Sequence, residues 1–174
     1  MVKELLDVSL PDLNLSRHGG DIYSLDKPSA IIDYSVCNNP LGPPKSFKKK
    51  VFSRRVDRNP DINYRAAANA IASRFKLNYE NIIIVNGTDE LIYLAIQTLK
   101  PRKALIPMPT YTEYKVACRN FRCEVVPYRL SEVNNFRFDV EDFITKINES
   151  IDMIILSNPN NPTGRLIDKG SLKI

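Results

Sequence analysis

The chain has 174 residues, a hydrophobic content of 43% and a formal net charge of +5 at pH 7. That length allows one domain with a sizeable core, or part of a larger one. No apolar run approaches the roughly 20 residues that span a bilayer, and the charged first residues do not resemble a signal peptide, so we expect a cytoplasmic protein without a membrane partner.

The first part of the chain lacks regular periodicity. Residues 1–44 predict an extended arm with loops and one short strand near residues 30–34. Residues 45–58 carry much of the excess positive charge, and their apolar residues recur at near-helical spacing, which predicts a short amphipathic helix with a basic, solvated face. Nucleic-acid binding by this segment is the alternative, and it is unlikely because no nucleic-acid-binding motif is present.

From Tyr64 onward the hydrophobic pattern becomes regular. Apolar residues three and four apart predict helices, and short aliphatic runs predict buried strands. The predicted helices span residues 64–75, 89–99, about 112–119 and 139–147, and the predicted strands span residues 82–85, 104–107, 123–127 and 153–156. Strands that alternate with helices indicate crossover connections, so we predict an α/β fold with a parallel sheet covered on both faces.

Cysteine and histidine usage excludes several kinds of site. Cys37, Cys118 and Cys123 form no CxxC pair, and His18 is the single histidine. We therefore expect neither a metal site nor a disulfide framework. A hydrolase of the Ser-His-Asp or Cys-His type could use only His18, and the sequence has no nucleophile-elbow motif.

Three loops follow predicted strands at their carboxyl ends, where open α/β sheets bind ligands. The loop at Asn86–Glu90 offers a glycine and free amides at a helix start, which suits a phosphate, although an ordinary turn before a helix is the favoured explanation of this loop taken alone. The loop at Pro109–Tyr114 offers Tyr111 for stacking on a planar ligand, or for packing over the sheet edge. The loop at Ser157–Gly164 offers Asn161 as an amide donor. Together they describe a site for a phosphorylated aromatic ring.

The same strings resemble the pyridoxal-phosphate (PLP) enzymes of the class I and II aminotransferase family, whose large domain is a fold-type I parallel-sheet domain. The matching strings are Gly87–Ile92, Pro109–Tyr114 and Asn158–Gly164. Their order is similar to that in histidinol-phosphate aminotransferases. The N-terminal strings His18–Asp21 and Asn39–Pro44 are more similar to threonine-phosphate decarboxylases, which belong to cobalamin synthesis.

The resemblance implies the cofactor pyridoxal 5′-phosphate and a role for each matching residue. The backbone amides of Thr88 and Asp89, after Gly87, would hold the cofactor phosphate. Tyr111 would stack on the pyridine ring, and Asn161 would hydrogen-bond its phenolic oxygen.

The N-terminal strings would contribute to the substrate site. His18 would sit near the substrate in an arm that closes over it, and Asn39 would help to bind it; a surface histidine explains His18 equally well. The chain departs from the family at Cys37, where an asparagine is usual, and at Asn59, where a tyrosine usually reaches the neighbouring subunit's cofactor phosphate.

The resemblance also implies a domain layout. Residues 1–44 would form the arm and part of a small domain, and residues 45–174 would form the first part of an incomplete PLP-binding large domain. The full-length enzyme would be a homodimer that acts on an amino acid or a phosphorylated amino acid. The Schiff-base lysine would lie beyond Ile174, so no catalytic residue is assigned and residues 1–174 are expected to be inactive.

We therefore expect the N-terminal portion of a PLP-dependent enzyme most like a threonine-phosphate decarboxylase. The first alternative is a histidinol-phosphate or other amino-acid aminotransferase, in which a proton rather than carbon dioxide leaves the α-carbon. The second alternative is a non-catalytic fragment or pseudoenzyme, because the lysine is missing.

Overall fold

The computed structural model describes residues 19–22, 25–27, 31–52 and 59–172. These residues fall into two compact units, one within residues 16–84 and one that contains residues 85–172. His18 and residues 53–58 of the predicted basic helix lie outside the described residues.

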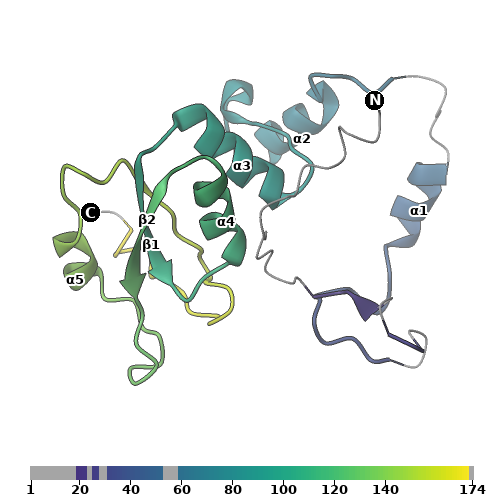
Figure 1. Ribbon diagram of the computed structural model, residues 1–174. Helices are drawn as coiled ribbons and strands as arrows, with labels where there is room; N and C mark the ends of the chain where they lie inside the picture. The colour runs from purple at the N-terminus through teal and green to yellow at the C-terminus, as the bar shows by residue number, and fades with distance from the viewer. Residues whose placement is uncertain (1–18, 23–24, 28–30, 53–58, 173–174) are drawn as a thin grey trace, which may run out of the picture. The chain divides into compact units, whose positions relative to one another are not determined.

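The unit within residues 16–84 contains helix α1 (Lys45–Phe52) and helix α2 (Arg65–Phe75) (Figure 1). The 3₁₀ turn η3 (Tyr79–Asn81) follows them. Both predicted helices of this region are therefore present. Ala30, where the first predicted strand begins, lies outside the described residues, and residues 31–34 form no strand. Residues 82–85 also form no strand, so that prediction is wrong.

The segment 82–85 shows why its prediction failed. Ile82 has extended backbone angles (φ −118°, ψ 123°), and Ile83 is 75% exposed. The aliphatic run is thus extended, as the sequence predicts, but no described strand lies beside it to accept its backbone hydrogen bonds. A strand needs such a neighbour as well as the right side chains.

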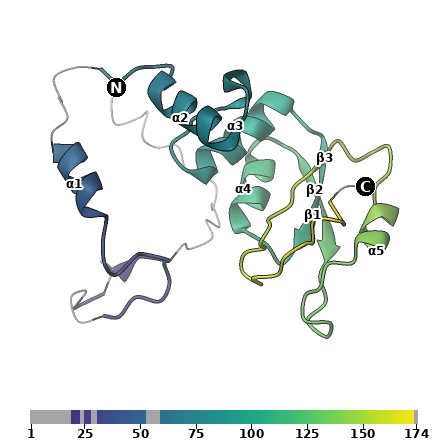
Figure 2. The ribbon, with the colours of Figure 1, turned by 180° about the vertical axis from the view of Figure 1, so that it is seen from behind.

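The second unit is a three-stranded parallel sheet with helices on both faces (Figures 1 and 2). Strands β1 (Lys103–Met108), β2 (Glu124–Arg129) and β3 (Met153–Ile154) lie in the order β2-β1-β3. The predicted α/β class is confirmed. The helices of this unit are α3 (Thr88–Leu99), α4 (Thr112–Asn120) and α5 (Val140–Thr145).

Alternating residues of β1 supply the two halves of the core. Ala104 and Ile106 face a buried cluster with residues of α3 and α4, such as Ile96 and Ala117. Leu105 faces the other side of the sheet, where it packs with Tyr128 of β2 and Phe143 of α5. Burial of both faces is typical of parallel strands and explains why β1 reads as one continuous apolar run.

The three cysteines are free. Cys118 and Cys123 are buried beside each other in the cluster under α4, and Cys37 is exposed in the other unit. Burial raises the pKa of the Cys118 thiol to about 12. Among the described residues, no group of acidic, histidine or cysteine side chains could hold a metal ion. Their helices are also too short or too polar to cross a membrane.

Asp152 fastens the amino end of β1 to the start of β3. Its Oδ2 accepts hydrogen bonds from the backbone N–H groups of Arg102 (2.8 Å) and Lys103 (3.0 Å), and its Oδ1 lies 3.6 Å from Nη2 of Arg102. These hydrogen bonds, and the Arg102 charge after them, hold the pKa of Asp152 below its usual value.

We predict that Asp152→Asn lowers stability at neutral pH and lowers it less in acid. Because the folded pKa is depressed, the carboxylate stabilises the fold above the unfolded pKa of about 3.9, and that contribution is lost as pH falls through the lower folded value. Urea unfolding of the parent and the variant at pH 7 and pH 2.5 measures the difference. Equal differences at the two pH values would contradict the assignment.

Candidate functional site

The first predicted loop leads into α3 with an uncapped helix start. Gly87 is the N-cap residue, at φ 88° and ψ 165°, a backbone conformation that favours glycine. No side chain caps the helix, and among the described residues nothing accepts from the N–H groups of Thr88 and Asp89. Free amides and the positive end of the helix dipole can bind a phosphate.

The acidic side chains beside this loop are already engaged. Glu90 Oε2 accepts a hydrogen bond from the backbone N–H of Asn86, and Asp89 Oδ1 accepts one from the Tyr111 hydroxyl at 2.8 Å. The carboxylates thus serve to shape the loop, and the backbone amides stay available to an anion.

The Asp89–Tyr111 hydrogen bond ties the first loop to the second. The Tyr111 ring also meets the Tyr114 ring edge-on, with centroids 5.7 Å apart at 84°, and packs against the α3–α4 core cluster. Burial, and then the Asp89 carboxylate, raise the pKa of Tyr111 to about 12. At neutral pH the phenol therefore keeps its proton and donates a hydrogen bond to Asp89.

Asn160 ties the second loop to the third. Its side chain is 8% exposed, and its Nδ2 donates to the carbonyl of Pro109 and to Thr163 Oγ1, both at 2.9 Å. Its Oδ1 accepts from Thr110 Oγ1 at 2.7 Å. One buried amide therefore fixes the backbone directly before Tyr111 and directly before Asn161.

Asn158 closes the base of the third loop. Its side chain accepts from the N–H of Ile167 (2.8 Å) and donates to the Ile167 carbonyl (3.2 Å). Both prolines of this loop follow cis peptide bonds. Asn161 stands at the exposed end, and its side chain makes no hydrogen bond within the described residues.

These contacts bring the predicted cofactor residues together. Asp89 touches Tyr111 directly, and Asn160 joins the Tyr111 loop to Asn161. The donor set fits a phosphorylated aromatic ring, because it combines free helix-start amides, a held aromatic ring and an unengaged amide. Asn39 lies in the other unit, where it caps its own turn by accepting from Leu41 N at 3.0 Å, and His18 lies outside the described residues.

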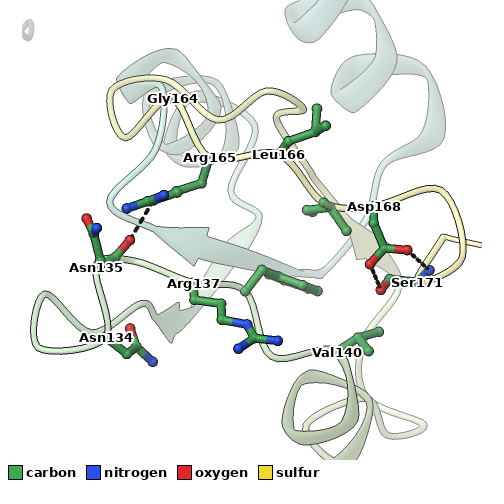
Figure 3. Close-up of a pocket in the computed structure, with 11 residues that line it drawn as sticks. Asn134, Asn135, Arg137, Val140, Gly164, Arg165, Leu166, Asp168 and Ser171 are labelled. Atoms are coloured by element: carbon green, nitrogen blue, oxygen red, sulfur yellow. Dashed lines mark hydrogen bonds between the residues drawn. The ribbon is translucent and has the colours of Figure 1, made fainter.

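A neighbouring hollow of about 670 Å³ does not include any of these residues (Figure 3). It lies between the segment after β2 and the segment that follows the third loop, and Arg137, Val140 and Leu166 are among its lining. Arg165 Nε donates a hydrogen bond to the carbonyl of Asn135 at 2.7 Å, which joins the segment after the third loop to the segment after β2 (Figure 3).

The contacts of the Asn160 side chain and of the Asp89 carboxylate are not predicted from the sequence. The motif holds three asparagines, and only the folded loop shows which of them turns inward. For Asp89 the sequence predicts a phosphate contact by the backbone amide and does not predict the side-chain contact with Tyr111. The one available signal was that position 89 starts a helix beside a tyrosine-bearing loop.

Comparison with known proteins places the chain among enzymes of one family. Residues 31–174 match the model of the family described as aminotransferase class I and II. The chain is 41% identical, over 91% of its length, to a putative threonine-phosphate decarboxylase of Caldanaerobacter subterraneus subsp. tengcongensis, of which it covers 42%. It is 30% identical, over 91% of its length, to the threonine-phosphate decarboxylase of Salmonella typhimurium, of which it covers 45%.

A solved structure of an aminotransferase is also similar to this chain. The histidinol-phosphate aminotransferase of Clostridium acetobutylicum superposes with a TM-score of 0.71 and 39% identity, over 82% of this chain and 42% of that one. The chain thus spans less than half the length of these relatives. Its family match covers most of the sequence, and the chain belongs to the class I and II aminotransferase family.

Proposed function

We propose that this chain carries cofactor-binding loops of a PLP-dependent enzyme that acts on a phosphorylated amino acid, most like L-threonine-O-3-phosphate decarboxylase. The observation that carries the proposal is the hydrogen bond from Tyr111 to Asp89, because it holds an aromatic ring beside free helix-start amides. The family match supports the cofactor.

Each loop has one task in this proposal. The N–H groups of Thr88 and Asp89 bind the cofactor phosphate, and the positive φ of Gly87 turns the backbone toward it. The Tyr111 ring stacks on the pyridine, and the Asn161 amide donates to the phenolic oxygen. The bound cofactor supplies an electron sink for charge that develops at the substrate α-carbon.

The choice of reaction rests on the relatives. The names of the Caldanaerobacter and Salmonella proteins favour decarboxylation of threonine phosphate, which would place the enzyme in cobalamin biosynthesis. The name of the Clostridium structure favours the alternative, transamination of histidinol phosphate. The enzyme that contains this sequence should release carbon dioxide from L-threonine O-3-phosphate. Amino transfer from histidinol phosphate to 2-oxoglutarate without such release would establish the alternative.

The remaining expectations stay part of the proposal. They are substrate contacts by His18 and Asn39, an arm in residues 1–44 followed by large-domain residues 45–174, a homodimer at full length and a cytoplasmic location. The family and the similarity to enzymes named for phosphorylated substrates support the substrate class.

We predict that Tyr111→Ala weakens cofactor binding by about twofold to tenfold, because the stacking contact is lost. Tyr111→Phe keeps the ring, loses the hydrogen bond to Asp89, and should weaken binding less. Equilibrium dialysis with pyridoxine 5′-phosphate measures this. The probe has no aldehyde, so the many lysines of the chain cannot bind it covalently.

The control is Tyr34→Ala, which removes a side chain that is 92% exposed in the other unit. It should bind the probe as the parent does. If Tyr111→Ala also binds as the parent does, the stacking role is wrong.

A second prediction separates two neighbouring asparagines. Asn160→Ala should lower the free energy of unfolding by about 1–3 kcal/mol, because it leaves buried polar groups of both loops unpaired. Asn161→Ala removes an exposed amide and should change stability by less than about 0.5 kcal/mol, yet it should weaken binding of pyridoxine 5′-phosphate. Urea unfolding and equilibrium dialysis on both variants give the four values. Equal loss of stability in the two variants would contradict the inward placement of Asn160.

A further inference from the structure

Three basic residues cluster where α4 ends and β2 begins, at the end of α4 away from Tyr111. Here a hollow of about 400 Å³ opens where α4 turns into β2, and we call it the α4–β2 hollow. Its lining consists of Lys115, Arg119, Arg122, Cys123, Glu124 and Val125. The three basic side chains are exposed, whereas Cys123 is buried and Val125 is half-buried.

The basic residues of this hollow have no acidic partner among the described residues. Glu124 is the acidic member of the lining, and its Oε2 lies 3.1 Å from Nζ of Lys103, which is outside the hollow. Lys115, Arg119 and Arg122 make no ion pair of their own within the described part of the chain. The described residues therefore leave the net positive charge of the hollow without an ion-pair partner.

The backbone keeps these charges close together. Lys115 and Arg119 are one turn apart on α4, where like charges repel each other and destabilise a helix slightly. Arg122 follows the helix end at φ 59°, a left-handed conformation that glycine adopts with less strain. A bound anion would offset the charge repulsion.

The hollow is separate from the proposed cofactor site. Cys123 and Glu124 stand at the amino end of β2, and Glu124 pairs with Lys103 at the amino end of β1. The cofactor loops follow the carboxyl ends of the strands. A strand of this length puts roughly 16 Å between the two ends.

We propose that the α4–β2 hollow binds a small molecule through its polyphosphate group. Three unpaired cations match the charge of such a group, and 400 Å³ is within the range of small-ligand pockets. Arginine and lysine together offer both forked and point-charge donors to phosphate oxygens. The bound polyphosphate would replace the missing acidic partners at the end of α4.

The test is calorimetric titration of the whole chain with tripolyphosphate at low ionic strength. The variant Lys115→Gln/Arg119→Gln/Arg122→Gln should lose affinity by about fivefold for each charge removed. The matched control is Lys48→Gln/Lys49→Gln/Lys50→Gln on α1, which removes the same charge from another basic segment. The control should bind tripolyphosphate nearly as tightly as the parent.

A single variant separates binding from folding. Arg122→Gly relieves the left-handed strain, so it should melt no lower than the parent while binding tripolyphosphate about fivefold more weakly. Unchanged affinity in the hollow variants would overturn the proposal, and so would equal losses in the two triple variants, which would reflect net charge alone. Tighter binding of a single-stranded oligonucleotide than of tripolyphosphate, lost with the same three residues, would replace it with a nucleic-acid surface.

Discussion

The side-chain amide of Asn160 is the contact on which the candidate site depends. It is buried between two loops that lie about fifty residues apart in the sequence, and it bonds to both. Its partners are a backbone carbonyl and two threonine hydroxyls, so every polar group in the junction is satisfied without charge. A neutral, fully bonded junction holds its shape over a wide range of pH, since nothing in it titrates.

A rigid junction restrains the position of the neighbouring residue Tyr111. Tyr111 stands one residue from a group that Asn160 holds, and its ring also packs against Tyr114, so it is ordered before a ligand arrives. The Asp89 carboxylate restrains the Tyr111 hydroxyl in the same way. Preordered side chains lose less entropy on binding, which is how a small set of contacts can hold a small ligand.

Much of this architecture could be predicted from the sequence, because helices α2, α3 and α4 and strand β1 follow from local periodicity alone. The failures have a common cause. Ile82–Val85 has the side chains of a strand but no described partner, and β3 is shorter than its predicted four residues. The motif around Asn161 was found for its residue types, whereas the inward position of Asn160 depends on two loops meeting. Pairing and loop contacts are properties of the whole chain, which single-residue preferences do not encode.

The burial of two cysteines beneath α4 makes the third a selective chemical handle. The thiolate is the nucleophile in alkylation, and the Cys118 thiol, with its pKa near 12, supplies almost none at neutral pH. Burial also raises the pKa of Cys123, while Cys37 stands in solvent. A maleimide dye added to the folded chain would therefore label the unit within residues 16–84 at one position. Labelling at Cys118 or Cys123 would then report that the sheet had opened.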